Sequence, residues 1–169
     1  YTQYRIESRY KNNILTEDYT DVVQAVVDGI NNQDPEMITK VFSTEIQEKY
    51  SNLSDDAMAL IEYVQGTDAV FEEDESRQAK NTRLGFTYVN EILASYKIIT
   101  SEKEYHHVFS SFARTDEGYE NIKGVQTICI QEYNPEGKEL VTIVAEPGIV
   151  IITDENYDDY VEYNEWDVN

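Results

Sequence analysis

The stretch IEYVQGTDAVF, residues Ile61–Phe71, holds the point at which the sequence changes from a helical to a strand pattern. Before Gly66, apolar residues recur every three or four positions, as they do along the buried stripe of a helix. After Gly66, the sequence consists of long runs rich in β-branched and aromatic residues, which is typical of strands. Helices followed by a run of strands predict an α+β fold, with the helices packed on one face of a mostly antiparallel sheet.

Four helices are predicted before this change of pattern. Asp34 and Pro35 indicate the start of the second helix, because Asp is a good N-cap and Pro fits the first helical position. Ser54 is expected to cap the fourth helix, and Gly66 is expected to end it as the C′ residue. The predicted helices cover residues 16–30, 35–42, 44–50 and 54–65, and the apolar stripe of the first consists of Val22, Val23, Val26, Val27 and Ile30.

Strands are predicted over most of the chain beyond Gly66. The polar residues 76–83 are interpreted as a loop, and a bulge is expected near Asn90. The turn at residues 134–137 contains Pro and Gly, which predicts a hairpin. The predicted strands cover residues 69–71, 86–99, 105–115, 122–133, 140–145 and 149–153.

The length and composition indicate one folded domain. The chain has 169 residues and is 40% apolar, which suffices for one hydrophobic core. It has no long repeat and no Gly/Ser linker. We therefore predict an N-terminal arm over residues 1–15, a single α+β domain over 16–153 and an acidic C-terminal tail over 154–169.

The charge of the chain excludes one class of partner and disfavours another. Thirteen Lys and Arg face 34 Asp and Glu, which gives a net charge of −21. A surface this acidic repels phosphate backbones, so nucleic acid is not an expected partner. It also repels anionic lipid head groups, so the folded domain is not expected to lie on a membrane by itself.

The single cysteine and the start of the chain bear on its location. Cys129 stands alone, so no internal disulfide is possible, and its position between two isoleucines in a strand predicts a buried, inert thiol. No apolar run reaches the roughly 18 residues of a membrane span. The chain begins at Tyr1, which is consistent with removal of a signal or lipid-attachment segment upstream.

Tyrosines and one histidine are the candidate ligand-binding residues. The chain has 14 tyrosines, whose apolar rings and polar tips suit the lining of a cavity. His106 and His107 are neighbours in a predicted strand, so only one of them can face such a cavity. The alternative for each residue is a structural role on a strand face. The candidates are His107, Tyr105, Tyr96, Tyr88 and Tyr63.

The sequence predicts no metal site and no cofactor. The acidic runs at residues 72–75 and 154–159 lack the alternating ligands and internal Gly of a calcium loop. Two adjacent histidines and one cysteine do not provide a zinc ligand set. No phosphate-binding, dinucleotide-binding or nucleophile motif is present.

Five segments resemble those of one family. Residues 37–43, MITKVFS, are similar to a segment that follows the first helix in a family of bacterial exported lipoproteins, and residues 61–66, IEYVQG, resemble the end of a helix in that family. ASYKIIT at 94–100, EYHHVF at 104–109 and PGI at 147–149 follow in the expected order. The resemblance, over about residues 16–153, is to the family of domain of unknown function 5104. It implies a cone-shaped, nuclear transport factor 2-like (cystatin-like) fold with a curved sheet, and export and lipid anchoring in a Gram-positive bacterium.

Three functions remain open. The first is an extracytoplasmic, lipid-anchored binding or interaction module, whose cavity or sheet surface holds a small-molecule or peptide ligand and which touches the membrane only through the removed N-terminal anchor. The second is a pocket enzyme of the isomerase or lyase type that uses His or Tyr with a carboxylate. The third is a homodimeric, partner-binding domain that associates through its open sheet face. The family brings no established activity and no catalytic residues.

Overall fold

The computed structural model describes residues 19–84, 87–115, 120–132 and 146–160, with side chains described over 19–73, 95–105, 120–132 and 146–160. The helices come first: one over residues 19–32, then α2 (Pro35–Thr39), α3 (Thr44–Lys49) and α4 (Leu53–Tyr63). The strands follow as β1 (Val70–Leu84), β2 (Thr87–Ile99), β3 (Glu104–Thr115), β4 (Gly124–Glu132) and β5 (Gly148–Ile152), with a 3-10 turn, η1 (Glu120–Ile122), before β4. The α+β class is confirmed.

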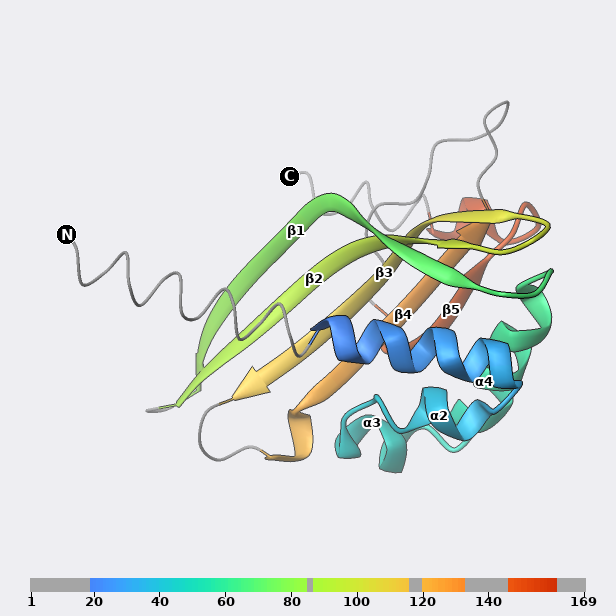
Figure 1. Cartoon of the computed structure of the whole chain (residues 1–169). Coiled ribbons are helices and arrows are strands. Elements are labelled where there is room, and N and C mark those ends of the chain that lie inside the picture. Colours follow the sequence, from blue (N-terminus) through green and yellow to red (C-terminus); the bar gives the residue numbers. More distant parts are fainter. Residues whose placement is uncertain (1–18, 85–86, 116–119, 133–145, 161–169) are drawn as a thin grey trace.

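The five strands form one open, mixed sheet in the order of the chain. β1 to β4 pair antiparallel with their neighbours, whereas β5 lies parallel to β4. The helices pack on one face of this twisted sheet and cover one end of it, while β1, β2 and β3 continue beyond them (Figure 1). The hairpin predicted at 134–137 and the strand predicted at 140–145 lie outside the described residues.

The main core lies between the helices and the sheet. The predicted stripe of the first helix is confirmed, because Val23, Val26 and Val27 are at most 1% exposed and Ile30 is also buried. Each of these residues removes apolar surface from water, the main driving force of folding. The buried residues that meet them come from α2, α4, β2 and β4, among them Ile38, Leu60, Ile98, Ile128 and Ile130.

The prediction of a loop at residues 76–83 is wrong. These residues belong to β1 and pair one by one with β2, from Arg77 opposite Ala94 to Leu84 opposite Thr87. Their polar composition reflects a place at the edge of the sheet and not a loop conformation. β1 is the outermost of the described strands, and charged residues are frequent on edge strands.

The predicted bulge near Asn90 is also wrong. Asn90 pairs regularly with a residue on each side, Asn81 and Arg114. In the pairing of β1 with β2, the irregularity lies in β1, where the three residues between Glu73 and Arg77 oppose a single residue of β2. This bulge changes the course of β1.

A smaller apolar cluster lies on the other face of the sheet. Cys129 alternates with Ile128 and Ile130 of the main core, so it points to the opposite side. There it packs with Val150, Ile152 and Tyr157, and Tyr157 comes from a helical turn over residues 157–160. The domain boundary predicted at residue 153 stays a prediction, but the chain packs against the sheet beyond it.

Candidate functional site

Two of the five predicted ligand-binding residues meet at the junction of α4 with the sheet. Tyr63 is the last residue of α4 and Tyr105 lies near the start of β3. Their ring centroids are 5.5 Å apart and the ring planes are inclined by 59°. Tyr105 is fully buried, whereas Tyr63 is half-buried. The structure therefore places these two side chains together, as one packed pair.

The hydroxyl groups of this pair bind main-chain groups. The Tyr105 hydroxyl accepts a hydrogen bond from the Gln65 N–H at 2.7 Å and donates one to the Tyr63 carbonyl at 3.2 Å. The Tyr63 hydroxyl accepts from the N–H of Glu132, at the end of β4, at 3.1 Å. The Glu132 carboxylate in turn forms a 2.9 Å ion pair with Lys103. Both tyrosines thus tie the end of α4 to the strands.

Both tyrosines of the pair are protonated at neutral pH, and burial moves their ionisation further from it. Burial raises the pKa of Tyr63 from 10.0 to about 12, because the charged phenolate would lose its hydration. Burial also raises the pKa of Tyr105. Tyrosines with a raised pKa donate and accept hydrogen bonds but do not act as bases near pH 7.

The pair is held by contacts between the segment after α4 and the turn joining β2 to β3. The Thr100 hydroxyl donates to the Gln65 carbonyl at 2.5 Å, and the Ser101 N–H donates to the Thr67 carbonyl at 2.9 Å. Gly66 passes close to this turn with a φ of +100°, and a Cβ on it would lie 2.5 Å from the Thr100 hydroxyl oxygen. Gly66 lies two residues beyond the C-cap Val64, so it is not the C′ residue that was predicted. A glycine is required there because the backbone approaches Thr100 closely.

The third predicted tyrosine, Tyr96, belongs to a separate group of rings. We name Tyr19, Phe71 and Tyr96 the aromatic cluster; they come from the first helix, β1 and β2. The ring of Tyr96 lies edge-on to those of Tyr19 and Phe71, with centroids 6.2 and 6.4 Å away. Edge-to-face packing of this kind is favourable because ring edges are positive and ring faces are negative.

The hydroxyl of Tyr96 is buried without a hydrogen-bond partner in the part of the chain that the structure describes. The residue is 0% exposed. Burial, with a smaller contribution from Cys129, raises its pKa, so the hydroxyl keeps its proton. Because buried hydroxyl groups are nearly always hydrogen-bonded, this group calls for an explanation.

The remaining predicted residues, Tyr88 and His107, lie in strands whose side chains at these positions are outside the described residues. Tyr88 pairs with Arg83 in the register of β1 and β2. His107 lies in β3, where the register with β4 shifts between His106 and Phe109. Such a shift interrupts strict alternation, on which the assignment of His107 to one face depended. Their ligand-binding roles stay predictions.

Cys129 is buried, as predicted. It is 1% exposed, and burial raises its pKa from 9.0 to about 12. A thiol with this pKa is protonated at neutral pH and is a poor nucleophile.

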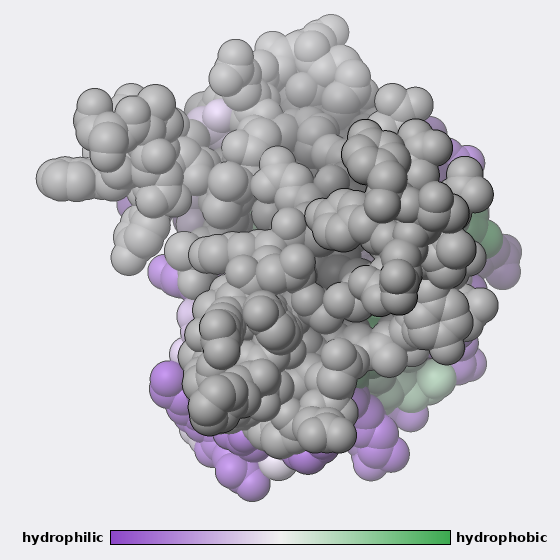
Figure 2. Space-filling view, turned by 90° about the vertical axis from the view of Figure 1, so that its left-hand side faces the viewer, coloured by the Kyte–Doolittle hydropathy of each residue, from purple (hydrophilic) through white to green (hydrophobic). Residues whose placement is uncertain are grey.

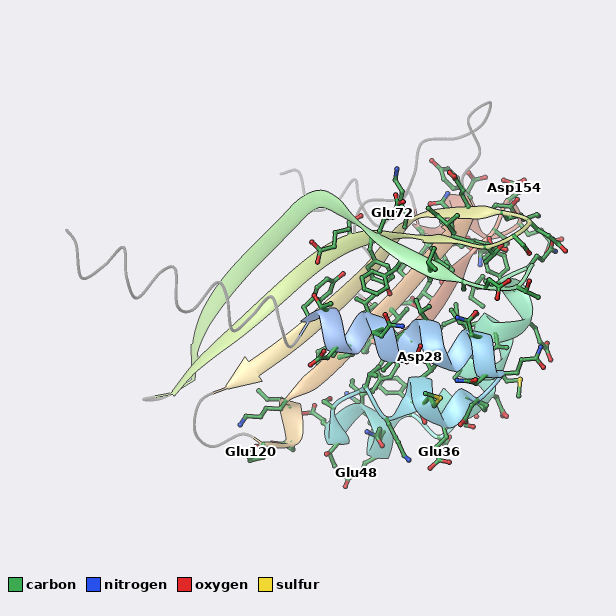
Figure 3. All side chains as sticks on the ribbon, viewed as in Figure 1. Asp28, Glu36, Glu48, Glu72, Glu120 and Asp154 are labelled. Carbon is green, nitrogen blue, oxygen red and sulfur yellow. The ribbon has the colours of Figure 1, made fainter. Side chains whose placement is uncertain are left out.

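The acidic side chains are spread over the molecule. Asp28, Glu36, Glu48, Glu72, Glu120 and Asp154 lie on helices, on η1 and at strand ends (Figure 3). Seen from the left-hand side of Figure 1, the described residues at the lower rim are mostly hydrophilic, with a small hydrophobic area to the right (Figure 2). Among the described side chains, no three His, Cys, Asp or Glu are close enough together to hold a metal ion.

The match to a known family covers most of this architecture. The family model described as "Domain of unknown function (DUF5104)" matches residues 25–136, from the first helix to just beyond β4. The chain belongs to this DUF5104 family. No match was found among the curated proteins. Within the described residues, no helix is both long enough and apolar enough to cross a membrane.

The first DUF5104-like segment, residues 37–43, fixes the backbone between α2 and β4. Phe42 is 3% exposed in the core and forms an isolated parallel bridge with Val125. The Ser43 N–H donates to the Val125 carbonyl at 3.0 Å, and the Ser43 hydroxyl caps α3 by accepting from the Ile46 N–H. Gly124 allows this approach, since a Cβ there would lie 2.9 Å from the Ser43 nitrogen. These residues of the segment have a structural role.

Sequence reasoning missed two members of the site region. Tyr19 stands four residues before Val23, so the apolar stripe of the first helix could have been extended to include it. Asn31 was interpreted only as part of the helix end. Its side chain binds both main-chain groups of Ala69, accepting from the N–H at 2.8 Å and donating to the carbonyl at 2.9 Å. No sequence signal links these two residues, which are 38 positions apart.

Proposed function

We propose that this DUF5104 domain is an exported, membrane-anchored binding module that holds a small ligand at the aromatic cluster. The resemblance of its segments to exported lipoproteins supports the location. The observation that supports ligand binding is the buried hydroxyl of Tyr96, which has no hydrogen-bond partner among the described residues. The wider likeness to the cone-shaped nuclear transport factor 2-like fold belongs to the same proposal, because such folds enclose space between helices and sheet.

The Tyr96 hydroxyl is energetically unfavourable without a hydrogen-bond partner. A buried hydroxyl without a hydrogen bond costs on the order of 1–3 kcal/mol. A phenylalanine would fill the same space without that cost. An oxygen or nitrogen acceptor of a bound ligand would recover the lost hydrogen bond, so Tyr96 is suited to be a ligand donor.

The surroundings of Tyr96 indicate an uncharged ligand. Its ring packs edge-on against the rings of Tyr19 and Phe71, which offer apolar and weakly polar surfaces. Burying a charge in such surroundings costs far more than burying a neutral carbonyl. The expected ligand is therefore small and mostly apolar, with one hydrogen-bond acceptor.

The proposal is tested by NMR on protein labelled with ¹³C in its tyrosine rings. Acetophenone, which has a carbonyl acceptor, is expected to shift the Tyr96 signals, and indole, which has no such acceptor, to bind more weakly. Tyr96→Phe should weaken acetophenone binding about tenfold, the loss of one hydrogen bond. Tyr50→Phe is the matched control, because Tyr50 is half-buried at the C-cap of α3 and is not a member of the aromatic cluster.

Two results would contradict ligand binding. The first is that neither probe shifts any tyrosine signal. The second is that Tyr96→Phe binds acetophenone as well as the wild type does. If Tyr96→Phe were in addition more stable than the wild type, Tyr96 would be a core tyrosine whose hydroxyl has no function.

The location is tested separately in bacteria that carry the gene. The protein should be found in the membrane fraction and should be digested when intact cells without their wall are treated with protease. Recovery in the cytosolic fraction, protected from protease, would overturn export while leaving ligand binding open.

A further inference from the structure

The charges along β1 are arranged in two blocks of opposite sign. Residues 72–75 are Glu, Glu, Asp and Glu, whereas the three charged residues of the second half, Arg77, Lys80 and Arg83, are all basic. All of them lie in one strand, Val70–Leu84. Among the described strands β1 pairs only with β2, so no described strand occupies its other edge (Figure 1).

We propose that β1 is a homodimer interface, in which the free edges of two copies pair antiparallel about a two-fold axis between Arg77 and Gln78. This inference is independent of the proposed ligand site. In this register Glu72 of one copy lies opposite Arg83 of the other, and Glu75 lies opposite Lys80. Because a two-fold interface is isologous, each of these pairs occurs twice.

The order of the charges selects this arrangement against others. In a parallel, in-register pairing, every residue meets its own copy, so acids face acids and bases face bases. Like charges directly opposite each other on neighbouring strands are destabilising, and opposite charges are stabilising. Charged residues also protect an edge strand from unspecific pairing. The two charge blocks on β1 therefore oppose parallel pairing of two copies of this edge and favour antiparallel pairing.

The bulge between Glu73 and Arg77 shapes the interface. It interrupts regular pairing of β1 with β2 at residues 74–76. Bulges bend an edge and discourage its extension. Backbone pairing alone is therefore a weak source of affinity here, and the four ion pairs are the part of the interface that substitutions should affect most.

Sedimentation equilibrium of the full 169-residue chain tests the interface. The wild type is expected to show a reversible monomer–dimer equilibrium. E75K and K80E should each weaken dimerisation at least about tenfold, because one substitution replaces two attractive pairs by two repulsive ones. The double variant E75K/K80E should return to within about threefold of the wild type, since each Lys again meets a Glu.

The two single variants separate local pairing from overall repulsion. Each copy carries a net charge of −21, so the dimer is opposed by long-range repulsion. E75K lowers that repulsion and K80E raises it. If only overall charge mattered, E75K would strengthen the dimer. The matched controls E62K and K49E make the same charge changes on exposed residues of α4 and α3, and they should change the dimerisation constant less than the β1 variants.

Folding of the variants needs one further comparison. Lys80 also stands opposite Glu91 in the register of β1 and β2, so K80E places two acidic residues at one register position of its own chain. The double variant keeps that change, and recovery of its dimer therefore isolates the contact between copies. A wild type that stays monomeric at millimolar concentration would overturn the proposal. A dimer that both single variants leave unchanged, or that the double variant does not restore, would do so too.

Discussion

Gly66 is the residue whose replacement should cost most at the end of α4. Its φ of +100° is unfavourable for any residue with a Cβ, and an added Cβ would lie 2.5 Å from the Thr100 hydroxyl oxygen. Gly66→Ala therefore combines backbone strain with displacement of the turn that holds Tyr63 and Tyr105. We expect it to lower the free energy of unfolding by about 3 kcal/mol, measured by urea denaturation.

Gly148→Ala is the matched control for this substitution. Gly148 has a similar φ of +96°, but nothing lies within 4 Å of an added Cβ. It should show the backbone cost alone, about 1 kcal/mol. Equal losses in the two variants would mean that the contact with Thr100 contributes nothing.

Asn31 joins the first helix to the start of β1 through two hydrogen bonds to the main chain of Ala69. Asn31→Ala removes both and leaves the partly buried main-chain groups of Ala69 unpaired. The expected loss in unfolding free energy is about 2 kcal/mol. The exposed neighbour Asn32 provides the control, since Asn32→Ala should change stability by less than about 0.5 kcal/mol. Similar losses in the two variants would contradict this role of Asn31.

At the residue scale, the sequence predicts features that depend on near neighbours. Asp34 was expected to cap a helix that begins with Pro35, and its side chain does accept from the Glu36 N–H. The prediction that Ser54 caps α4 is wrong, because the helix begins at Leu53 and its N-cap is Asn52, two residues before Ser54. The hydrogen bonds of Asn31 and of Tyr105 join residues about 40 positions apart, and no local pattern encodes them.

At the scale of elements, β1 shows how pairing overrides composition. Residues 76–83 are polar and contain three basic residues, which favours a loop. The strand forms because β2 offers it a complete set of antiparallel partners from Arg77 to Leu84. Strand propensity describes fit to a half-buried surface, so a strand at the edge of a sheet can carry polar residues that a local pattern assigns to a loop.

The segment over residues 154–160 covers the second apolar cluster, and Asn156 holds it in place. The Asn156 side chain accepts from the Thr153 N–H at 2.7 Å and donates to the Ile151 carbonyl at 2.9 Å. Asn156→Ala should loosen the segment and expose Cys129 beneath Tyr157. Because Cys129 is the only cysteine, its reaction with dithionitrobenzoate reports this opening directly. We expect a rate at least about tenfold higher.

Asp154→Ala is the control within the same segment. Asp154 is exposed, and its substitution removes one charge without removing any of the side-chain hydrogen bonds of Asn156. The rate of the Cys129 reaction should stay within about twofold of the wild type. A rate unchanged by Asn156→Ala would show that residues 154–160 do not control access to the thiol.

At the scale of the molecule, the order of elements was predictable and part of the topology was not. The change of pattern at Gly66 separates the helices from the sheet, and the α+β class follows from it. The parallel pairing of β5 with β4 depends on the route of the chain between them, which local periodicity does not describe. Tyr63 and Tyr105 meet because α4 ends where β3 begins, a relation that only the assembled fold defines.

Buried groups whose pKa is raised make the whole molecule sensitive to alkali. The pKa of Cys129 is raised from 9.0 to about 12 and that of Tyr63 from 10.0 to about 12. Above pH 9 the unfolded chain therefore loses protons that the folded chain keeps. Since the unfolded state then binds fewer protons, the free energy of unfolding falls as the pH rises from 9 towards 12.

The contribution of Cys129 to this loss can be isolated from the slope of the unfolding free energy against pH. Between pH 9 and 10 the thiol contributes up to about 1.4 kcal/mol per pH unit, before the tyrosines ionise in the unfolded chain. Cys129→Ala should lower stability at pH 7 by loss of packing, yet its stability should fall less steeply above pH 9. Asn32→Ala should keep the wild-type slope. Both proteins are measured by urea denaturation from pH 7 to 11. Parallel curves of unfolding free energy against pH would mean that the thiol ionises as readily in the folded chain as in the unfolded one. In that case the segment over residues 154–160 does not exclude water from the thiol.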